Sequence, residues 1–148
     1  NFKNFFNSDN FQCKFISSSM KNSITFNEAV KFSDYENNFF KIDIEGSEYE
    51  ILEDMINFQN KINGIAIEFH NCRENIDRIA DFVGKIKLEI VHIHANNYDE
   101  YKYNEIPQTL EISFAKNPNI IGEFNGLPHP FDSPNRSKSK EIELTFND

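Results

Sequence analysis

FFKIDIEGSEYEIL, the stretch at residues 39–52, decides the fold because it joins a strand to a helix through a sharp turn. Its near-continuous apolar run, residues 39–44, predicts a buried parallel strand. Gly46 permits the chain to leave that strand sharply, and Ser47 is placed to cap a helix that the apolar spacing predicts over residues 47–60. A strand, a turn and a helix in this order indicate an α/β domain built on a parallel sheet.

The segments on either side of this stretch extend the alternation of strands and helices. Upstream, residues 13–17 predict a short strand, and Thr25 followed by Glu28 forms the capping-box pattern of a short helix over residues 26–32. Downstream, the apolar pattern predicts a strand, an amphipathic helix and two further strands, at residues 64–69, 73–86, 88–94 and 109–116. The last two strands have no helical pattern between them, so we expect them to pair antiparallel as a hairpin.

Length and composition limit the class of protein. The 148 residues suffice for one domain with its own core, so we expect a single domain over residues 1–148, with an irregular, proline-rich tail over 117–148 packed on it. The net charge of −9 argues against nucleic-acid partners and against docking on anionic membranes. No apolar run approaches the roughly 20 residues that span a bilayer, so we expect no membrane segment.

The cysteine count indicates the compartment. Cys13 and Cys72 are too few for a disulfide framework, and neither has a neighbour that suggests a zinc pair. We therefore expect two free thiols and a reducing, cytoplasmic location. The sequence leaves the oligomeric state open.

Two pairs of polar residues stand at the ends of neighbouring predicted strands. Asp43 and Glu45 are two residues apart, so their side chains lie on the same side of the first strand, and Glu68 and His70 repeat this spacing at the next. Ligands of open α/β sheets bind at the carboxyl ends of the strands. One of these carboxylates, or His70, is therefore a candidate general base that takes the proton from an acceptor hydroxyl.

A structural role is the competing explanation for the same residues. Asp43 and Glu45 can cap helix ends or pair with lysine, and a histidine at a strand end is often only hydrogen-bonded. Glu48 is predicted to be a helix-start charge that complements the helix dipole.

His92 and His94 form an H-x-H pair on one face of a predicted strand. Such a pair can bind zinc or iron when a carboxylate joins it. His70, Asp43 or Glu45 would complete a ligand set of this kind. The pattern alone is a weak signal for a metal.

The favoured interpretation of this segment needs no metal. His94, Asn96 and Asn97 would hydrogen-bond loop backbone and shape an acceptor pocket. Asn96 and Asn97 would form the turn out of the strand, because asparagine tolerates left-handed backbone. We therefore count His94 and Asn96 among the candidate catalytic residues and assign no metal ligand.

Several segments together resemble the FkbM family of methyltransferases. The segment KIDIEGSEYEIL (41–52) closely resembles the family signature K-I/L-D-I/V-E-G-x-E-x-x-I/V-L. Segments that resemble the family's next strand, its final hairpin and its tail are IEFH (67–70), VHIHANNY (91–98), IPQTLEISF (106–114) and LPHPFDSPN (127–135). Their order and spacing agree with the family over residues 39–146.

The resemblance implies a class I methyltransferase that uses S-adenosyl-L-methionine and has a Rossmann-like sheet, mostly parallel with a terminal antiparallel hairpin. We expect the chain to be the carboxyl-terminal part of such a domain, incomplete at the N-terminus, because it has no Gly-rich turn for the cofactor. The implied reaction methylates an oxygen, so the expected partner is a small-molecule or glycan acceptor. Asp43 would bind the cofactor beside its methyl group. The candidate catalytic residues are Asp43, Glu45, Glu68, His70, His94 and Asn96.

Two other classes of function stay open. Without the cofactor-binding half, the chain would be a non-catalytic, truncated methyltransferase-like interaction module. A metal-dependent hydrolase built around His92, His94 and the carboxylates is the third class. The residues alone do not specify the acceptor.

Overall fold

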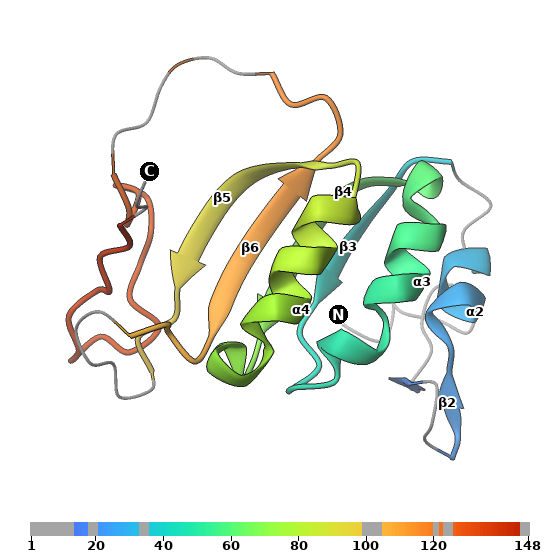
Figure 1. Cartoon of the computed structure of the whole chain (residues 1–148), viewed down its shortest axis with the longest axis horizontal. Helices are drawn as coiled ribbons and strands as arrows, with labels where there is room; N and C mark the ends of the chain where they lie inside the picture. The colour runs from blue at the N-terminus through green and yellow to red at the C-terminus, as the bar shows by residue number, and fades with distance from the viewer. Residues whose placement is uncertain are drawn as a thin grey trace, which may run out of the picture.

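A four-stranded sheet with helices on one face forms the centre of the structure (Figure 1). The computed structural model describes the following parts of the chain: residues 14–17, 21–32, 36–98, 105–119, 122 and 126–145. The strands stand in the order β3, β4, β6, β5, and their bounds are Asn38–Ile42, Ile62–Phe69, Leu110–Ala115 and Glu89–Ala95.

Three strands of this sheet point the same way. β3 pairs parallel with β4, whereas β6 pairs antiparallel with both β4 and β5. The predicted hairpin of the last two strands is confirmed, but the expected mostly parallel sheet is mixed, because β6 inserts between β4 and β5. The insertion gives β6 two paired neighbours and alternating buried residues, and it leaves β5 at the edge of the described sheet.

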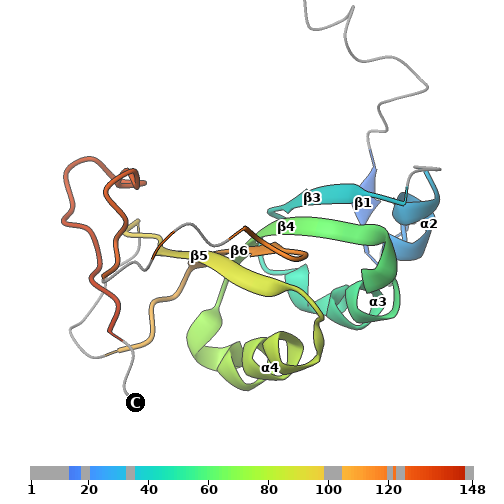
Figure 2. The same cartoon turned by 90° about the horizontal axis from the view of Figure 1, so that it is seen from above.

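Helices α3 (Leu52–Asn57) and α4 (Cys72–Lys85) cover one face of the sheet, as Figure 2 shows from above. Aromatic rings connect α4 to the strands: Phe69 and Phe114 both meet Phe82 edge-on, with ring centres 6.3 and 5.7 Å away. Edge-to-face pairs of this kind add about 0.5–1.5 kcal/mol to the burial of the rings. None of the helices in the described ranges has the length and apolarity needed to cross a bilayer.

The continuous helix predicted over residues 47–60 is wrong. The short helix α3 is flanked by two 3-10 turns, η1 (Glu48–Glu50) and η2 (Gln59–Lys61). Ser47 precedes η1 without a side-chain capping hydrogen bond, so its predicted capping role is also wrong. The carboxylate of Glu48 turns back to the preceding loop, and this contact shapes the start of the segment.

The upstream elements are confirmed in part. Thr25 and Glu28 form the predicted capping box of helix α2 (Phe26–Lys31), with Thr25 Oγ1 accepting from the Glu28 amide at 3.1 Å. The predicted strand at 13–17 is present as β1 (Phe15–Ile16), although Cys13 lies outside the described residues. β1 does not join the main sheet, because it pairs parallel with β2 (Ser23–Ile24) in a separate two-stranded sheet.

The sheet face opposite α3 and α4, which we call the open face, carries alternate residues of the four strands. Phe39, Glu68, His92 and Ser113 lie on it, according to the strand register. The apolar run of β3 predicted a strand that is buried on both sides. This prediction is wrong, because Phe39 lies on the open face and is 68% exposed. The Phe39 ring lies over Gly64, where an added Cβ would stand only 2.8 Å from it.

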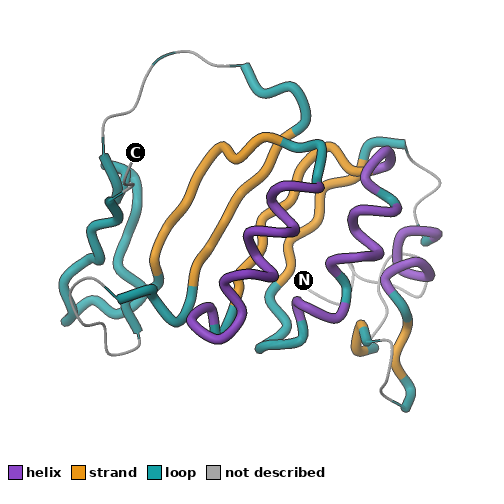
Figure 3. Tube along the Cα trace, in the orientation of Figure 1, coloured by secondary structure: helices purple, strands orange, loops and turns teal. Residues whose placement is uncertain are grey.

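The tail, residues 126–145, is irregular and runs beside the outer edge of β5 (Figure 3). Leu127 and Leu144 pair as an isolated antiparallel bridge, and Ile142 is buried in the core. Phe131 is 91% exposed. A few apolar anchors, and not a regular element, therefore fix this segment.

Candidate functional site

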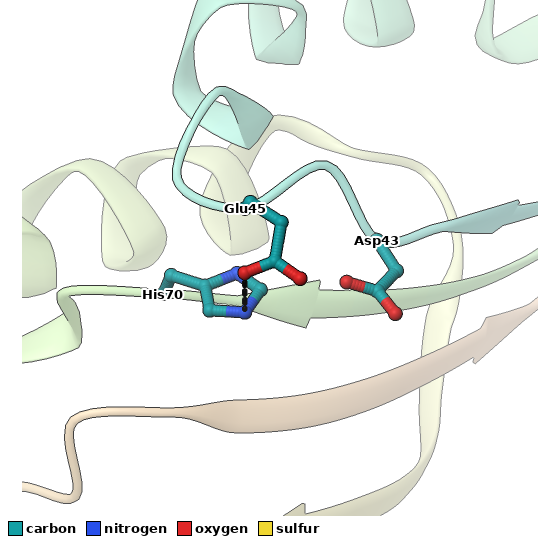
Figure 4. Close-up of side chains that lie close together, drawn as sticks. All are labelled: Asp43, Glu45 and His70. Atoms are coloured by element: carbon teal, nitrogen blue, oxygen red, sulfur yellow. Dashed lines mark ion pairs between the residues drawn. The ribbon is translucent and has the colours of Figure 1, made fainter.

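Five polar residues meet at the carboxyl ends of the strands on the open face. They form the strand-end cluster: Asp43, Glu45, Glu68, His70 and Asn96. Asp43 follows β3, Glu68 and His70 stand at the end of β4, and Asn96 follows β5. Figure 4 shows Asp43, Glu45 and His70 with their side chains turned toward one another. The structure thus brings together five of the predicted site residues.

Short distances connect the members of the strand-end cluster. Asn96 donates its Nδ2–H to Glu68 Oε1 at 3.0 Å. His70 Nε2 lies 3.7 Å from Glu45 Oε2 and 3.9 Å from Glu68 Oε1. One potential ligand atom from each of Asp43, Glu45 and His70 lies within 4.8 Å of the other two. These three residues therefore have the donor atoms and the spacing to hold a metal ion.

The exposure of the side chains in the cluster increases from a half-buried floor to an exposed rim. The side chains of Glu68 and His70 are 14% and 20% exposed, whereas those of Asp43 and Glu45 are 43% and 87% exposed. Lys41 Nζ lies 3.9 Å from Asp43 Oδ2, so the competing prediction of a lysine pair is also present. An exposed pair of this kind contributes at most about 1 kcal/mol. A ligand can therefore reach the rim from solvent and contact the floor.

A left-handed turn directs Glu45 into the cluster. Glu45 and Gly46 have φ angles of 54° and 98°, a conformation that costs a residue other than glycine about 1–2 kcal/mol. The buried carboxylate of Glu48 holds this turn by accepting the amide N–H of Ile44 at 3.1 Å and that of Gly46 at 3.1 and 3.2 Å. The predicted helix-start role of Glu48 is therefore wrong, because its charge binds the loop before the helix.

His70 is fixed at its ring and at its backbone. Its Nδ1 lies 3.0 Å from Glu48 Oε1, and Tyr49 donates its hydroxyl to the His70 carbonyl at 2.6 Å. Burial raises the pKa of Tyr49 well above its ordinary value, so the hydroxyl stays a neutral donor. A carboxylate can only accept, so the ring donates Nδ1–H to Glu48 and directs Nε2 toward Glu45 and Glu68.

The environment of Glu68 suits a proton acceptor. Burial raises the pKa of this carboxyl above its ordinary value, the hydrogen bond from Asn96 opposes the shift, and the negative charges of Asp43 and Glu111 add to it. A carboxylate whose charged form is destabilised binds a proton more strongly than an exposed one.

His92 and His94 contact the tail instead of the strand-end cluster. His92 Nε2 lies 2.9 Å from Asp132 Oδ1, and His94 Nε2 lies 3.3 Å from Glu141 Oε2. We call these two pairs the tail clamp. The other ring nitrogen of His94 lies 3.5 Å from Glu111 Oε2. Neither histidine belongs to a group of potential metal ligands in the described ranges, so the alternative ligand set around the H-x-H pair is not formed there.

Two neighbouring asparagines serve different parts of the molecule. Asn96 binds Glu68 and also accepts the Tyr98 amide at 2.9 Å, as expected of a turn residue. Asn97 is buried and binds the tail: its Oδ1 accepts the Arg136 amide at 2.8 Å, and its Nδ2 lies 3.2–3.3 Å from three tail carbonyls. Asn97 therefore hydrogen-bonds loop backbone, as predicted, and this backbone belongs to the tail.

Glu48 is the functional residue that the sequence interpretation misplaced. A usable signal was present, because an acidic residue two positions after Gly46 is within reach of the amides that a sharp turn leaves unpaired. Helical spacing obscured that signal by assigning Glu48 to the helix that follows.

A model of a protein family matches most of this chain. The model described as "Methyltransferase FkbM domain" matches residues 8–143, a range that contains the strand-end cluster and the tail clamp. No curated protein and no solved structure matched the chain significantly.

Proposed function

The chain belongs to the FkbM methyltransferase family, and from this premise we propose that it transfers a methyl group from S-adenosylmethionine to a hydroxyl oxygen of a small molecule or a sugar. The observation that carries the proposal is the strand-end cluster at the carboxyl ends of the strands. It combines the Glu68 carboxyl, whose pKa is raised, with the oriented imidazole of His70 and the amide of Asn96. Open α/β sheets bind their ligands at this edge.

The proposed reaction is a direct displacement. When bound, S-adenosylmethionine would supply a methyl carbon that the acceptor oxygen can attack, with a carbon–oxygen bond replacing the carbon–sulfur bond and a neutral thioether released. The acceptor proton passes to Glu68, which lies on the half-buried floor of the cluster and is oriented by Asn96. Positioning of the two reactants supplies much of the rate, and the base contributes about 10²–10⁴-fold.

The remaining cluster residues have supporting roles in this proposal. Asp43 would help to bind the cofactor, because its exposed carboxylate attracts the cationic sulfonium of S-adenosylmethionine. Glu45 and His70 contact the acceptor from the exposed rim and the floor. His94 has both ring nitrogens directed at Glu111 and Glu141, so in this proposal it shapes the neighbouring surface and does not touch the reactants.

The charge of the site favours a neutral acceptor. Asp43, Glu45, Glu48 and Glu68 place several carboxylates around one imidazole, so an anionic acceptor would be repelled. A sugar hydroxyl is neutral and hydrogen-bonds to carboxylates and amides. These two properties support a glycan or another polyol as the substrate class.

The test is methyl transfer by the purified full-length protein. We expect label from methyl-labelled S-adenosylmethionine to appear in one member of a panel of monosaccharides, oligosaccharides and small alcohols. An equal amount of S-adenosylhomocysteine should form. A calorimetric titration with S-adenosylmethionine gives the second readout. Absence of both binding and transfer would contradict the proposal and favour a non-catalytic interaction module.

A further inference from the structure

We infer that Asp43, Glu45 and His70 form a binding site for a divalent metal ion, of the type that accepts one imidazole nitrogen and two carboxylate oxygens. The donors come from the end of β3, from the left-handed turn after it and from the end of β4, and Figure 4 shows them converging. Their ligand atoms lie within 4.8 Å of one another. An ion bonded at about 2.0–2.6 Å to each donor spans separations of up to about 4–5 Å.

The orientation of the imidazole is an independent observation that points to a ligand. Glu48 is fully buried, and its carboxylate already accepts the amides of Ile44 and Gly46, so it receives Nδ1–H from His70. A carboxylate that binds the far side of a metal-ligating imidazole fixes the tautomer and makes the other nitrogen a better ligand. His70 Nε2 is thereby directed at the Glu45 carboxylate on the rim.

The distances from Nε2 fit a shared ion better than direct hydrogen bonds. Nε2 stands 3.7 Å from Glu45 Oε2 and 3.9 Å from Glu68 Oε1. Hydrogen bonds of this type are about 2.7–3.2 Å long, whereas two ligands of one ion are separated by more than that.

The local charge also calls for a cation. The carboxylates of Asp43, Glu45, Glu48 and Glu68 surround His70, and Lys41 reaches only the exposed Asp43. Carboxylates gathered at a partly buried site repel one another unless a cation compensates them. A divalent ion on the rim neutralises two of them at once.

The donor set indicates which ions fit. Imidazole suits Zn²⁺ and other transition metals, whereas carboxylate oxygens suit Mg²⁺ and Mn²⁺, so a mixed set favours Mn²⁺ or Zn²⁺. At this position the ion would polarise an acceptor hydroxyl as a Lewis acid. That role depends on the proposed methyl transfer, whereas binding of the ion does not.

The experiment measures Mn²⁺ binding to the metal-stripped full-length protein by electron paramagnetic resonance, without S-adenosylmethionine or acceptor. We expect one ion per chain, displaced by Zn²⁺. Asp43→Asn, Glu45→Gln and His70→Gln should each weaken binding by about tenfold or more. Glu53→Gln removes an exposed carboxylate elsewhere on the surface and should leave binding unchanged.

Each outcome of this experiment decides the inference. No Mn²⁺ binding by the wild type, or equal binding by the wild type and Glu45→Gln, would overturn it. Glu45 is 87% exposed, so its substitution leaves the core intact, and circular dichroism checks this. If Mn²⁺ binds as expected and methyl transfer is absent, the metal site stands and the proposed function fails.

Discussion

The strand-end cluster and the tail clamp place histidines beside carboxylates on the same sheet face, yet their chemistry differs. In the cluster, one nitrogen of His70 is bound by the buried Glu48 and the other faces exposed or half-buried carboxylates. In the clamp, His92 is paired to Asp132, and both nitrogens of His94 have a partner. The first arrangement leaves a ring nitrogen available to a ligand, and the second uses the rings to hold a segment of chain.

The difference comes from what covers each histidine. The end of β4 is followed by a left-handed residue, Asn71, and then by α4, so the chain turns away from the open face. β5 lies at the edge of the described sheet, and the tail lies beside it. A short E-x-H or H-x-H pattern is therefore uninformative until the neighbouring chain is known.

The largest expected effect separates the two regions by activity. Glu68→Gln should lower kcat for methyl transfer by about 10²–10⁴-fold, because the variant keeps the shape and the bond to Asn96 but loses the proton acceptor. His92→Asn, a change in the clamp, should keep kcat close to the wild-type value. Steady-state kinetics with labelled cofactor measure both. Equal losses in the two variants would remove the distinction between the regions.

Stability distinguishes Glu48, which holds the turn, from the exposed rim of the cluster. Glu48→Ala should lower the free energy of unfolding by about 2–4 kcal/mol, because the amides of Ile44 and Gly46 would lose their acceptor in a partly buried turn. Glu45→Gln on the rim should change it by less than about 0.5 kcal/mol. Urea titrations followed by circular dichroism give both values. A Glu48→Ala protein as stable as wild type would show that the turn does not depend on this carboxylate.

Two adjacent asparagines give a matched test of the same comparison. Asn97→Ala should cost about 1–3 kcal/mol and expose the tail to proteases, because several hydrogen bonds to residues 136–140 are lost. Asn96→Ala should instead reduce activity with little effect on the tail. Limited proteolysis with mass spectrometry locates the cleavage. Tail cleavage in both variants, or in neither, would contradict the division of roles.

The raised pKa of Glu68 predicts that its ionised carboxylate, although proposed to act as the base, destabilises the folded state. Because the folded state holds the Glu68 proton more strongly than the unfolded state does, the ionised side chain destabilises the fold at neutral pH. With a chelator present, Glu68→Gln should therefore unfold at an equal or higher urea concentration than wild type at pH 7. The difference should shrink as the pH falls through the folded pKa of Glu68. Lower stability of the variant at pH 7 would show that the charge is compensated.

The smallest effect concerns the thiol beneath the cluster. Burial raises the pKa of Cys72 to about 11, and its Sγ donates to the Phe69 carbonyl at 3.1 Å. At pH 8 iodoacetamide should leave Cys72 unmodified in the native protein and label it after denaturation in urea. Peptide mass spectrometry reads this residue separately. Rapid labelling at pH 8 would mean that the floor of the cluster opens to solvent.

Local patterns predicted the four strands of the main sheet, the capping box of Thr25 and the clustering of five site residues, because alternation of side chains and the direction of parallel strands are short-range rules. They did not predict β2. Two other features depend on long-range contacts that those rules do not contain. One is the insertion of β6 between β4 and β5. The other is the contact between the side chains of His94 and Glu141, which lie 47 positions apart in the sequence.

The role of Glu48 was predicted incorrectly for a different reason. The position of Glu48 in the sequence fits the apolar spacing of the helix that follows. Its stabilising hydrogen bonds are instead made to the loop that precedes it. A carboxylate at a strand–helix junction can satisfy either, and only the coordinates of the amides at positions 44 and 46 distinguish the two.

The left-handed backbone at Glu45 has a consequence for laboratory evolution of this chain. Glycine or asparagine tolerates that geometry better than glutamate does. A library selected only for heat tolerance should therefore enrich these two residues at position 45, whereas one selected for turnover should retain the acid. Sequencing both pools would reveal whether this position is maintained for chemistry at the expense of robustness.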